Sequence, residues 1–149
     1  MITIHSIGHS NHPLERFLAL LGQHAIEALV DVRSVPYSKH APQYRKRALQ
    51  EAVAARGLTY LQLGQELGGT PRAAPPVFQA GLERLLSLAA QRRVVIMCAE
   101  EDPARCHRSS LIAAALRERG AAVMHLRGDG RSHLDGAVPA GTAGQPLSL

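Results

Sequence analysis

The stretch that decides the fold runs from residue 93 to residue 119: Arg93-Val-Val-Ile-Met97, then Cys98-Ala-Glu-Glu-Asp-Pro-Ala-Arg-Cys-His-Arg108, then Ser109-Ser-Leu-Ile-Ala-Ala-Ala-Leu-Arg-Glu-Arg119. The first segment is short, apolar and β-branched, which predicts a fully buried strand. The last segment has the composition of a helix and is followed by Gly120, a residue that often ends helices. The middle segment therefore leaves the carboxyl end of a buried strand and enters a helix, which is where open α/β sheets place their ligands.

Strand-like and helix-like segments alternate along the rest of the chain. Short apolar runs predict strands over residues 2–7, 28–32, 58–61 and 121–126, and amphipathic spacing predicts helices over 13–21, 43–56, 77–92 and 104–119. Residues 64–76, rich in Gly and Pro, are predicted to form a long irregular loop of the kind used as a lid or binding segment. We predict an α/β fold: a single three-layer domain over residues 1–127, with about five mainly parallel strands and helices on both faces. Residues 128–149 lack periodicity and are predicted to be a flexible tail.

Length and composition restrict the class of protein. At 149 residues we expect one domain, and 46% hydrophobic residues are typical of a folded globule. The chain has no run of about 20 apolar residues and no signal-like N-terminus, so we expect a cytoplasmic protein without membrane contact. A net charge of +5 is compatible with phosphate-bearing or nucleic-acid partners. Two cysteines do not build a disulfide scaffold, and the sequence specifies neither a cofactor nor an oligomeric state.

Polar clusters at residues 8–10, 31–33, 60–69 and 98–108 follow four of the predicted strands, and we expect them to meet at one edge of the sheet. We predict that a small anion binds at this edge. The residues predicted to contact it are Gly8, His9, Ser10, Asp31, Arg33, Ser38, Cys98 and Arg108. Structural alternatives stand beside this prediction, because Ser10 can cap a helix and Asp31 can form an ion pair with Arg33 that fixes the loop.

Three residues of the middle segment are candidates for catalysis: Cys106, His107 and Glu100. Cys106 lies in the first turn of the predicted helix among cationic neighbours, so the helix dipole and these charges favour its thiolate. Glu100 is a candidate general base or a partner of His107. Cys98 ends a buried strand, and we expect it to react with alkylating agents more slowly than Cys106.

Familiar cysteine and nucleotide sites do not fit the middle segment. Cysteine-based phosphatases and sulfurtransferases separate Cys from Arg by about five residues, whereas six residues, several of them acidic, separate Cys98 from Arg105. The spacing of the cysteines and His107 is not that of a structural zinc site, and we assign no residue to a metal. A glycine-rich dinucleotide motif does not follow the first predicted strand.

Four ordered motifs carry a resemblance that spans about residues 2–126. They are Ser6-Ile-Gly-His-Ser10, Leu29-Val-Asp-Val-Arg-Ser-Val-Pro-Tyr-Ser38, Leu61-Gln-Leu-Gly-Gln-Glu-Leu-Gly-Gly69 and Met97-Cys-Ala-Glu with Cys106-His-Arg108. Together they resemble the domain of unknown function family 488. The resemblance implies a compact α/β fold found in bacteria and archaea, and it assigns no activity. The motif positions carried over are His9, Asp31, Arg33, Pro36, Ser38, Gly68, Gly69, Cys98, Glu100, Cys106, His107 and Arg108, with one departure, Tyr44, where the family usually has Phe.

Three functions are compatible with these residues. The first is an enzyme that acts on a phosphate-bearing small molecule or nucleotide, using Cys106 or Glu100 with His107, and arginines to hold the anion. The second is a nucleic-acid-associated binding protein, in which the basic residues between 34 and 47 contact phosphates. The third is a metal- or redox-sensing protein that uses Cys98 and Cys106. Salt-dependent nucleic-acid binding would favour the second function, and stoichiometric bound metal would favour the third.

Overall fold

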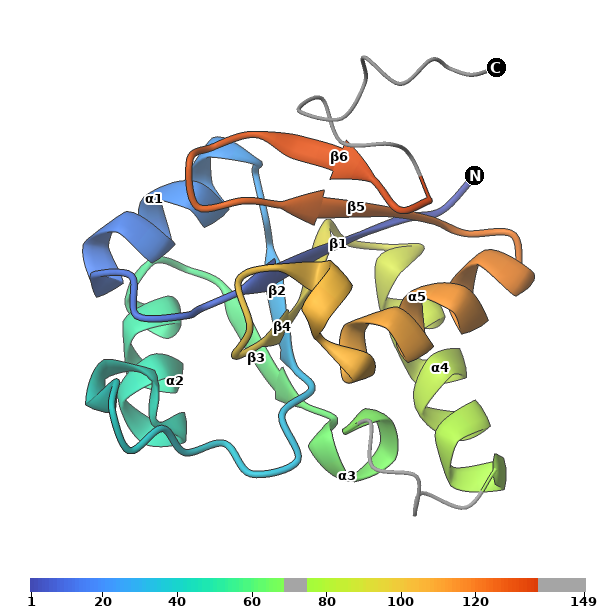
Figure 1. Cartoon of the computed structure of the whole chain (residues 1–149), viewed down its shortest axis with the longest axis horizontal. Helices are drawn as coiled ribbons and strands as arrows, with labels where there is room; N and C mark the ends of the chain where they lie inside the picture. Colours follow the sequence, from blue (N-terminus) through green and yellow to red (C-terminus); the bar gives the residue numbers. More distant parts are fainter. Residues whose placement is uncertain (69–74, 137–149) are drawn as a thin grey trace.

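The computed structural model describes residues 1–68 and 75–136 and forms one six-stranded sheet flanked by helices (Figure 1). The strands are β1 (Thr3–Gly8), β2 (Ala28–Asp31), β3 (Thr59–Gln62), β4 (Val94–Cys98), β5 (Ala122–Leu126) and β6 (Ser132–Leu134). The helices are α1 (Leu14–Gln23), α2 (Lys46–Ala55), α3 (Gly64–Leu67), α4 (Pro75–Ala89) and α5 (His107–Glu118), with short 3₁₀ turns η1 (Pro42–Tyr44) and η2 (Pro103–Arg105). The predicted α/β fold is confirmed.

The sheet has the strand order β3-β2-β4-β1-β5-β6. The first five strands in the chain pair in parallel, and β6 pairs with β5 antiparallel. All five residues of β4 are buried, as the apolar sequence of residues 94–97 predicts. The strand that leads into the Cys98–Cys106 loop is therefore one of the two central strands of the sheet.

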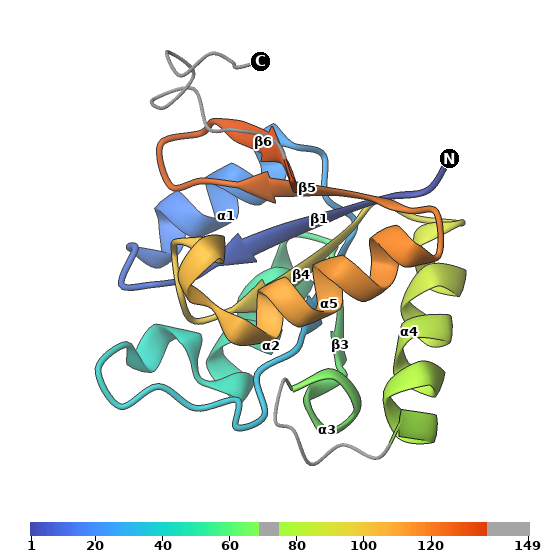
Figure 2. The ribbon, with the colours of Figure 1, turned by 45° about the vertical axis from the view of Figure 1, so that its right-hand side comes forward.

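Two apolar layers hold the helices to the sheet. Helices α1 and α2 pack on one face, where Phe17, Leu21 and Leu49 belong to one buried cluster. Helices α4 and α5 pack on the other face, where Leu82, Leu85 and Ile112 belong to a second cluster. Figure 2 shows α5 lying across one face of the sheet beside α4. The predicted three-layer arrangement follows from the order of the connections: β1 to β3 run over one face, and β3 to β5 return over the other.

The helices predicted to begin at residues 43 and 104 begin instead at Lys46 and His107, each after a short 3₁₀ turn. Two other segments differ more. Residues 64–67 form the short helix α3 inside the segment expected to be an irregular loop, while residues 69–74 lie outside the described residues. The prediction that a flexible tail begins at residue 128 is wrong for residues 128–136. In this segment β6 extends the sheet, and the Asp135 N–H donates to the Val123 carbonyl at 2.7 Å. Periodicity could not reveal β6, since it is only three residues long and follows a tight turn.

The helices of the described residues are short. None of them is long and apolar enough to cross a bilayer.

Candidate functional site

The loops after β1, β2 and β4 meet at the carboxyl edge of the sheet, as the sequence predicts. Gly8 is paired with Cys98, and Asp31 is paired with Met97. The His9 N–H donates to the Cys98 carbonyl at 2.9 Å, and the Ser10 N–H donates to the Ala99 carbonyl at 2.8 Å. A Cβ at position 8 would overlap the Glu100 carbonyl, so only glycine allows these two loops to pack this closely. Gly8 and Ser10 therefore shape the edge through their backbones.

Asp31 and Arg33 form a buried, two-pronged ion pair. The Arg33 Nε donates to Asp31 Oδ1 at 2.9 Å, and Nη2 donates to Oδ2 at 2.7 Å. The Tyr60 hydroxyl donates to the same Oδ2 at 2.6 Å. Arg33 is only 3% exposed, so its guanidinium is committed to the carboxylate. The structure therefore contains the ion pair between Asp31 and Arg33 that was the alternative to anion binding. The contact of either residue with an anion stays a prediction.

His9 joins this network as a neutral imidazole. Its Nδ1 lies 2.7 Å from the Ser10 carbonyl, which can only accept a hydrogen bond, so Nδ1 carries the proton. Its Nε2 then accepts from Arg33 Nη1, at 3.4 Å. Burial, with the charge of Arg33 adding to it, lowers the pKa of His9 to about 4, although the Ser10 hydrogen bond opposes the shift. At neutral pH His9 is therefore an uncharged part of the scaffold.

Tyr44 fixes the β2–α2 connection against His9. The two rings stack with centroids 4.4 Å apart and an interplanar angle of 17°. The Tyr44 hydroxyl donates to the His12 carbonyl at 2.5 Å, a bond that a phenylalanine at this position could not make. Tyr44 thus ties the long connection to the loop that follows β1.

The predicted single site is divided between the two faces of the sheet. Val30 and Val32 belong to the cluster under α4 and α5, so the side chain of Asp31, which alternates with them, points to the opposite face. Cys98 and Cys106 belong to that same α4–α5 cluster. The network of Asp31, Arg33, His9 and Tyr60 and the cysteine loop therefore share one edge but face opposite layers.

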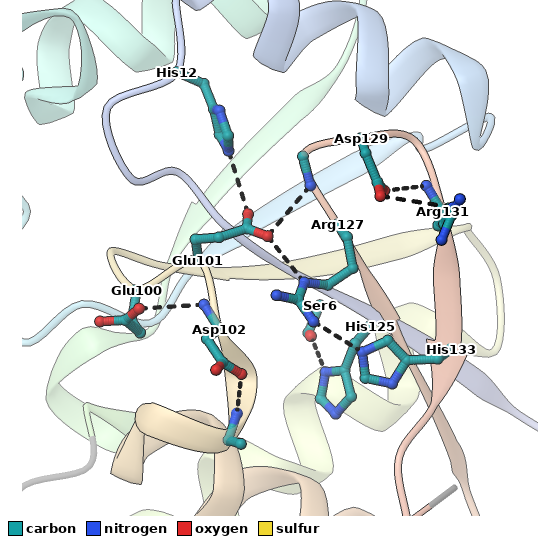
Figure 3. Close-up of polar contacts among 12 residues, drawn as sticks. Ser6, His12, Glu100, Glu101, Asp102, His125, Arg127, Asp129, Arg131 and His133 are labelled. Carbon is teal, nitrogen blue, oxygen red and sulfur yellow. Dashed lines mark hydrogen bonds and ion pairs between the residues drawn. The ribbon is translucent and has the colours of Figure 1, made fainter. Parts of the chain in front are cut away.

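The loop from Cys98 to Cys106 is held by its own polar groups. The Glu100 carboxylate accepts from the Asp102 N–H at 3.2 Å, and the Asp102 carboxylate accepts from the Ala104 N–H at 3.0 Å, which caps η2 (Figure 3). Cys98 donates its S–H to the Glu100 carbonyl at 3.6 Å. Glu100 itself is exposed, which leaves its carboxylate open to solvent. Its role as a base stays a prediction.

Cys106 is the N-cap residue of α5. Its Sγ accepts the N–H of Ser109 at 3.3 Å, so the sulfur occupies the place that a Ser or Asp oxygen fills in most helices. Both cysteines are thiols, 6% exposed at Cys98 and 8% at Cys106, so burial does not distinguish them. The backbone of His107 and Arg108 opens α5, and the side chains of these two predicted site residues lie outside the described part of the structure.

Two other predicted positions shape loops. Ser38 Oγ accepts from the Ala41 N–H at 3.0 Å, within the connection from β2 to α2. A Cβ at Gly68 would overlap the Gly64 carbonyl, so the end of α3 packs tightly against its own first residue. Gly69 lies outside the described residues.

Glu101 is a junction that the sequence does not reveal. One carboxylate oxygen accepts from Arg127 Nε at 2.9 Å, and the other lies 3.3 Å from His12 Nε2 (Figure 3). The Gly128 N–H also points to this carboxylate, at 3.5 Å. Glu101 thus links the cysteine loop to the β1–α1 and β5–β6 connections. Only the fold brings these segments together, because they are separated by many residues in the chain.

A second missed group lies between β1, β5 and the end of β6. Ser6 Oγ lies 2.5 Å from His125 Nδ1, and His125 Nε2 lies 2.8 Å from Asp135 Oδ1. Burial raises the pKa of Asp135, but hydrogen bonds from His125 and Arg117 outweigh it, so the pKa of Asp135 is lowered. The carboxylate can only accept, so the proton lies on His125 Nε2. Sequence reasoning missed this group because Asp135 falls in the segment predicted to be a tail.

A pocket of about 220 Å³ opens between the start of α5 and the β5–β6 hairpin. Its lining combines the cysteine loop and α5 on one wall with strand residues on the other: Asp102, Pro103, Ala104, Ser110, His125, Arg127, His133, Asp135 and Gly136. Burial lowers the pKa of His133, and the nearby His125 and Arg127 lower it further. In the described part of the chain, no group of three or more His, Cys, Asp or Glu side chains is arranged to hold a metal ion.

Comparison with known proteins identifies a family and no activity. The family model of the domain of unknown function DUF488 matches residues 13–77 and 72–115. No curated protein matches. Among solved structures, the chain is similar to the solution NMR structure of a de novo designed protein with a P-loop NTPase fold, with 13% identity and a TM-score of 0.48. That match covers 85% of this chain and 68% of the designed one.

Proposed function

Since this chain belongs to the DUF488 family, whose description states no activity, we propose its function from its own residues: it binds a small phosphate-bearing molecule at the start of α5, with Cys106 as the reacting thiolate. The observation that carries the proposal is the hydrogen bond from the Ser109 N–H to Cys106 Sγ. A backbone donor and the positive end of the 12-residue helix α5 both favour the ionised sulfur. A cysteine in such a position is suited to nucleophilic chemistry near neutral pH.

The position of Cys106 in the sheet supports ligand binding. The chain leaves β4 toward the α5 face, whereas the neighbouring strands β1 and β2 continue toward α1 and α2 on the other face. Adjacent loops that diverge in this way leave a crevice at the carboxyl edge, where open α/β sheets bind their ligands. The first turn of α5 adds backbone N–H groups that suit a phosphate. The 220 Å³ pocket beside Pro103 and Ser110 provides room next to this turn.

The charges of the loop define how the ligand would be used. Glu100, Glu101 and Asp102 precede the helix, and their carboxylates disfavour attack of sulfur on the phosphorus atom itself. In our proposal the phosphate is the group by which the molecule is held, and the Cys106 thiolate adds to a carbonyl carbon elsewhere in it. The new C–S bond replaces the C=O π bond, whose electron pair goes to the carbonyl oxygen, which then takes a proton. Glu100, which is exposed, is the candidate to accept or return a proton during this step.

The test is a thermal-shift titration with inorganic phosphate and with nucleoside mono- and diphosphates. A ligand at a hundredfold excess over its Kd should raise the Tm of the wild type by about 5–10 °C. Arg108→Ala should lose most of this shift. Arg84→Ala, which removes the same charge from the exposed face of α4, should keep it. Equal shifts in all three proteins, or none, would refute the proposed site.

A second variant separates binding from chemistry. Cys106→Ser keeps an acceptor for the Ser109 N–H, so it should keep the phosphate-dependent Tm shift. It should no longer be modified by an electrophilic phosphate ester such as a bromoacetylated sugar phosphate, detected by intact mass. Modification of Cys106→Ser at the wild-type rate would show that another residue reacts.

A further inference from the structure

The connection between β2 and α2, together with the first two residues of α2, is rich in positive charge. We call residues 34–47 the basic loop, and this segment contains no Asp or Glu. Its cationic or ionisable residues are Lys39, His40, Arg45, Lys46 and Arg47. All five of these side chains are exposed. Within the described part of the chain, Arg47 pairs with Glu51, and both partners are well exposed, so this pair is weak. The charge of the basic loop is therefore available to a partner.

An aromatic ring is exposed within this charge. The Tyr37 side chain is 54% exposed, and the guanidinium carbon of Arg45 lies over its ring, 4.5 Å from the centroid. Arg45 Nε also donates to the Ser38 carbonyl at 3.3 Å, which holds the guanidinium in place. The arginine covers one face of the ring, and the exposed remainder of the side chain is available to stack on a flat partner.

The basic loop has a defined shape, although it contains little regular structure. The Lys46 N–H donates to the Pro36 carbonyl at 3.0 Å, which closes the loop at its base. Ser38 Oγ accepts from the Ala41 N–H, and the buried Tyr44 anchors the loop through its bond to the His12 carbonyl. A surface that is already ordered loses less conformational entropy when a partner binds. Figure 1 shows this segment as a long connection on the outside of the molecule, between β2 and α2.

We propose that the basic loop binds single-stranded nucleic acid, with phosphates on Lys39, Arg45 and Lys46 and an unpaired base on Tyr37. Single strands present phosphates and accessible base faces together, and proteins hold them with cations and aromatic rings. In a duplex the base faces are stacked on one another, so a duplex could bind only through its phosphates to the cations of the basic loop. This inference does not rest on Cys106 or on the proposed phosphate ligand.

The test is fluorescence anisotropy with a labelled oligouridine of about 12 nucleotides, long enough for one binding site. The logarithm of the binding constant should fall linearly with the logarithm of salt concentration, with a slope of about −2, as expected when about three phosphates are neutralised. A duplex of equal length should compete more weakly. These results would support a single-strand site.

Variants of the basic loop separate the contribution of base stacking from that of phosphate binding. Tyr37→Ala should weaken binding about tenfold and leave the salt slope unchanged, because a stacked base carries no charge. The double change Lys39→Ala and Lys46→Ala removes two phosphate contacts and should make the slope shallower by about 1.4. All three positions are exposed in a loop or at its end, so a thermal melt of each variant should match the wild type.

A charge-matched control decides whether the site is specific. The double change Arg84→Ala and Arg92→Ala removes two exposed cations from α4 and from the turn before β4. It should leave the affinity for oligouridine within about twofold of the wild type. An equal loss in this control, or no loss with Tyr37→Ala, would overturn the proposal. Tighter binding to phosphatidylserine vesicles than to oligouridine, lost in the basic-loop variants, would also overturn it in favour of a membrane.

Discussion

Two groups of polar side chains lie at the same edge of the sheet and use their polar atoms differently. On the α1–α2 face, Asp31, Arg33, His9 and Tyr60 bond to one another and are largely buried. On the α5 face, Asp102 caps η2 and Cys106 caps α5, and Glu100 is exposed. The first group is organised to hold the strands' ends in place. The second is organised to present groups at a helix start, and changes in the two groups should have different consequences.

The largest expected effect is loss of stability when the buried ion pair is broken. Asp31→Ala leaves the Arg33 guanidinium buried without its carboxylate and removes the acceptor of Tyr60, so it should lower the free energy of unfolding by about 3–5 kcal/mol. Urea denaturation measures this change. The control is Glu51→Ala, which removes an exposed i,i+4 pair and should cost about 0.5 kcal/mol or less. A loss below about 1 kcal/mol for Asp31→Ala would mean that water or another side chain replaces the carboxylate.

The second expected effect is a dependence of stability on pH. The pKa of His9 is lowered to about 4 in the folded protein, against about 6.5 in the unfolded chain. The unfolded state therefore binds more protons between these values, so the stabilisation is complete above pH 6.5 and is lost as pH falls toward 4. His9 alone contributes about 3 kcal/mol across this window.

Urea denaturation between pH 7 and pH 4.5 tests this contribution. His9→Gln should be less stable than the wild type at pH 7 and should show a shallower loss of stability on acidification. The control is His40→Gln, a change at an exposed residue of the basic loop, which should follow the wild-type curve. If the wild type and His9→Gln lose stability in parallel, His9 is not the residue that binds the proton.

The sequence predicted the edge but not its division into two faces. Apolar runs and helix signals place Gly8, Asp31 and Cys98 at the carboxyl ends of parallel strands, and the strand register confirms that they meet. The alternation of side chains along β2 decides which face Asp31 joins, but it cannot be applied until the faces of the sheet are known. A buried strand is apolar on both sides, so its pattern does not indicate which layer each side chain meets.

The groups missed by sequence reasoning depend on contacts between distant segments. Glu101 meets Arg127 and His12, and Ser6 meets Asp135 through His125. Ser6 and His125 lie in β1 and β5, whereas His12, Glu101 and Arg127 lie in three different connections. Asp135 follows β6 and lies beyond the final predicted strand. Local propensity carries information over a few residues, whereas these contacts require the strand order, which places β1 beside β5. The predicted catalytic and anion-binding roles of the site residues remain predictions.

A smaller effect should follow from removing the cap of α5. Cys106→Ala deprives the Ser109 N–H of its acceptor and should cost about 1 kcal/mol of folding stability. Cys106→Ser supplies a hydroxyl oxygen at the same position and should recover most of that loss. Urea denaturation of the two variants at pH 7 gives the comparison. Equal stability of the two variants would indicate that the sulfur acts by filling space and not by capping the helix.

The smallest expected effect compares the two thiols of the cysteine loop. The bond from Ser109 N–H and the α5 dipole favour the Cys106 thiolate, whereas Cys98 donates its S–H to the Glu100 carbonyl, which favours the neutral form. Cys106 should therefore have the larger fraction of thiolate near pH 7, but a more acidic thiolate is also a weaker nucleophile, which reduces the difference in rate.

Cys106 should therefore be labelled faster than Cys98 by only a small factor, on the order of a few-fold, under brief iodoacetamide treatment followed by peptide mass mapping. Because both thiols are similarly buried, access alone should not reverse the order. Cys106→Ser provides the control, since the rate at Cys98 should not change when its neighbour is replaced by another capping residue. Faster labelling of Cys98 in the wild type would place the reactive sulfur at the end of β4 and remove the support for Cys106 as the nucleophile.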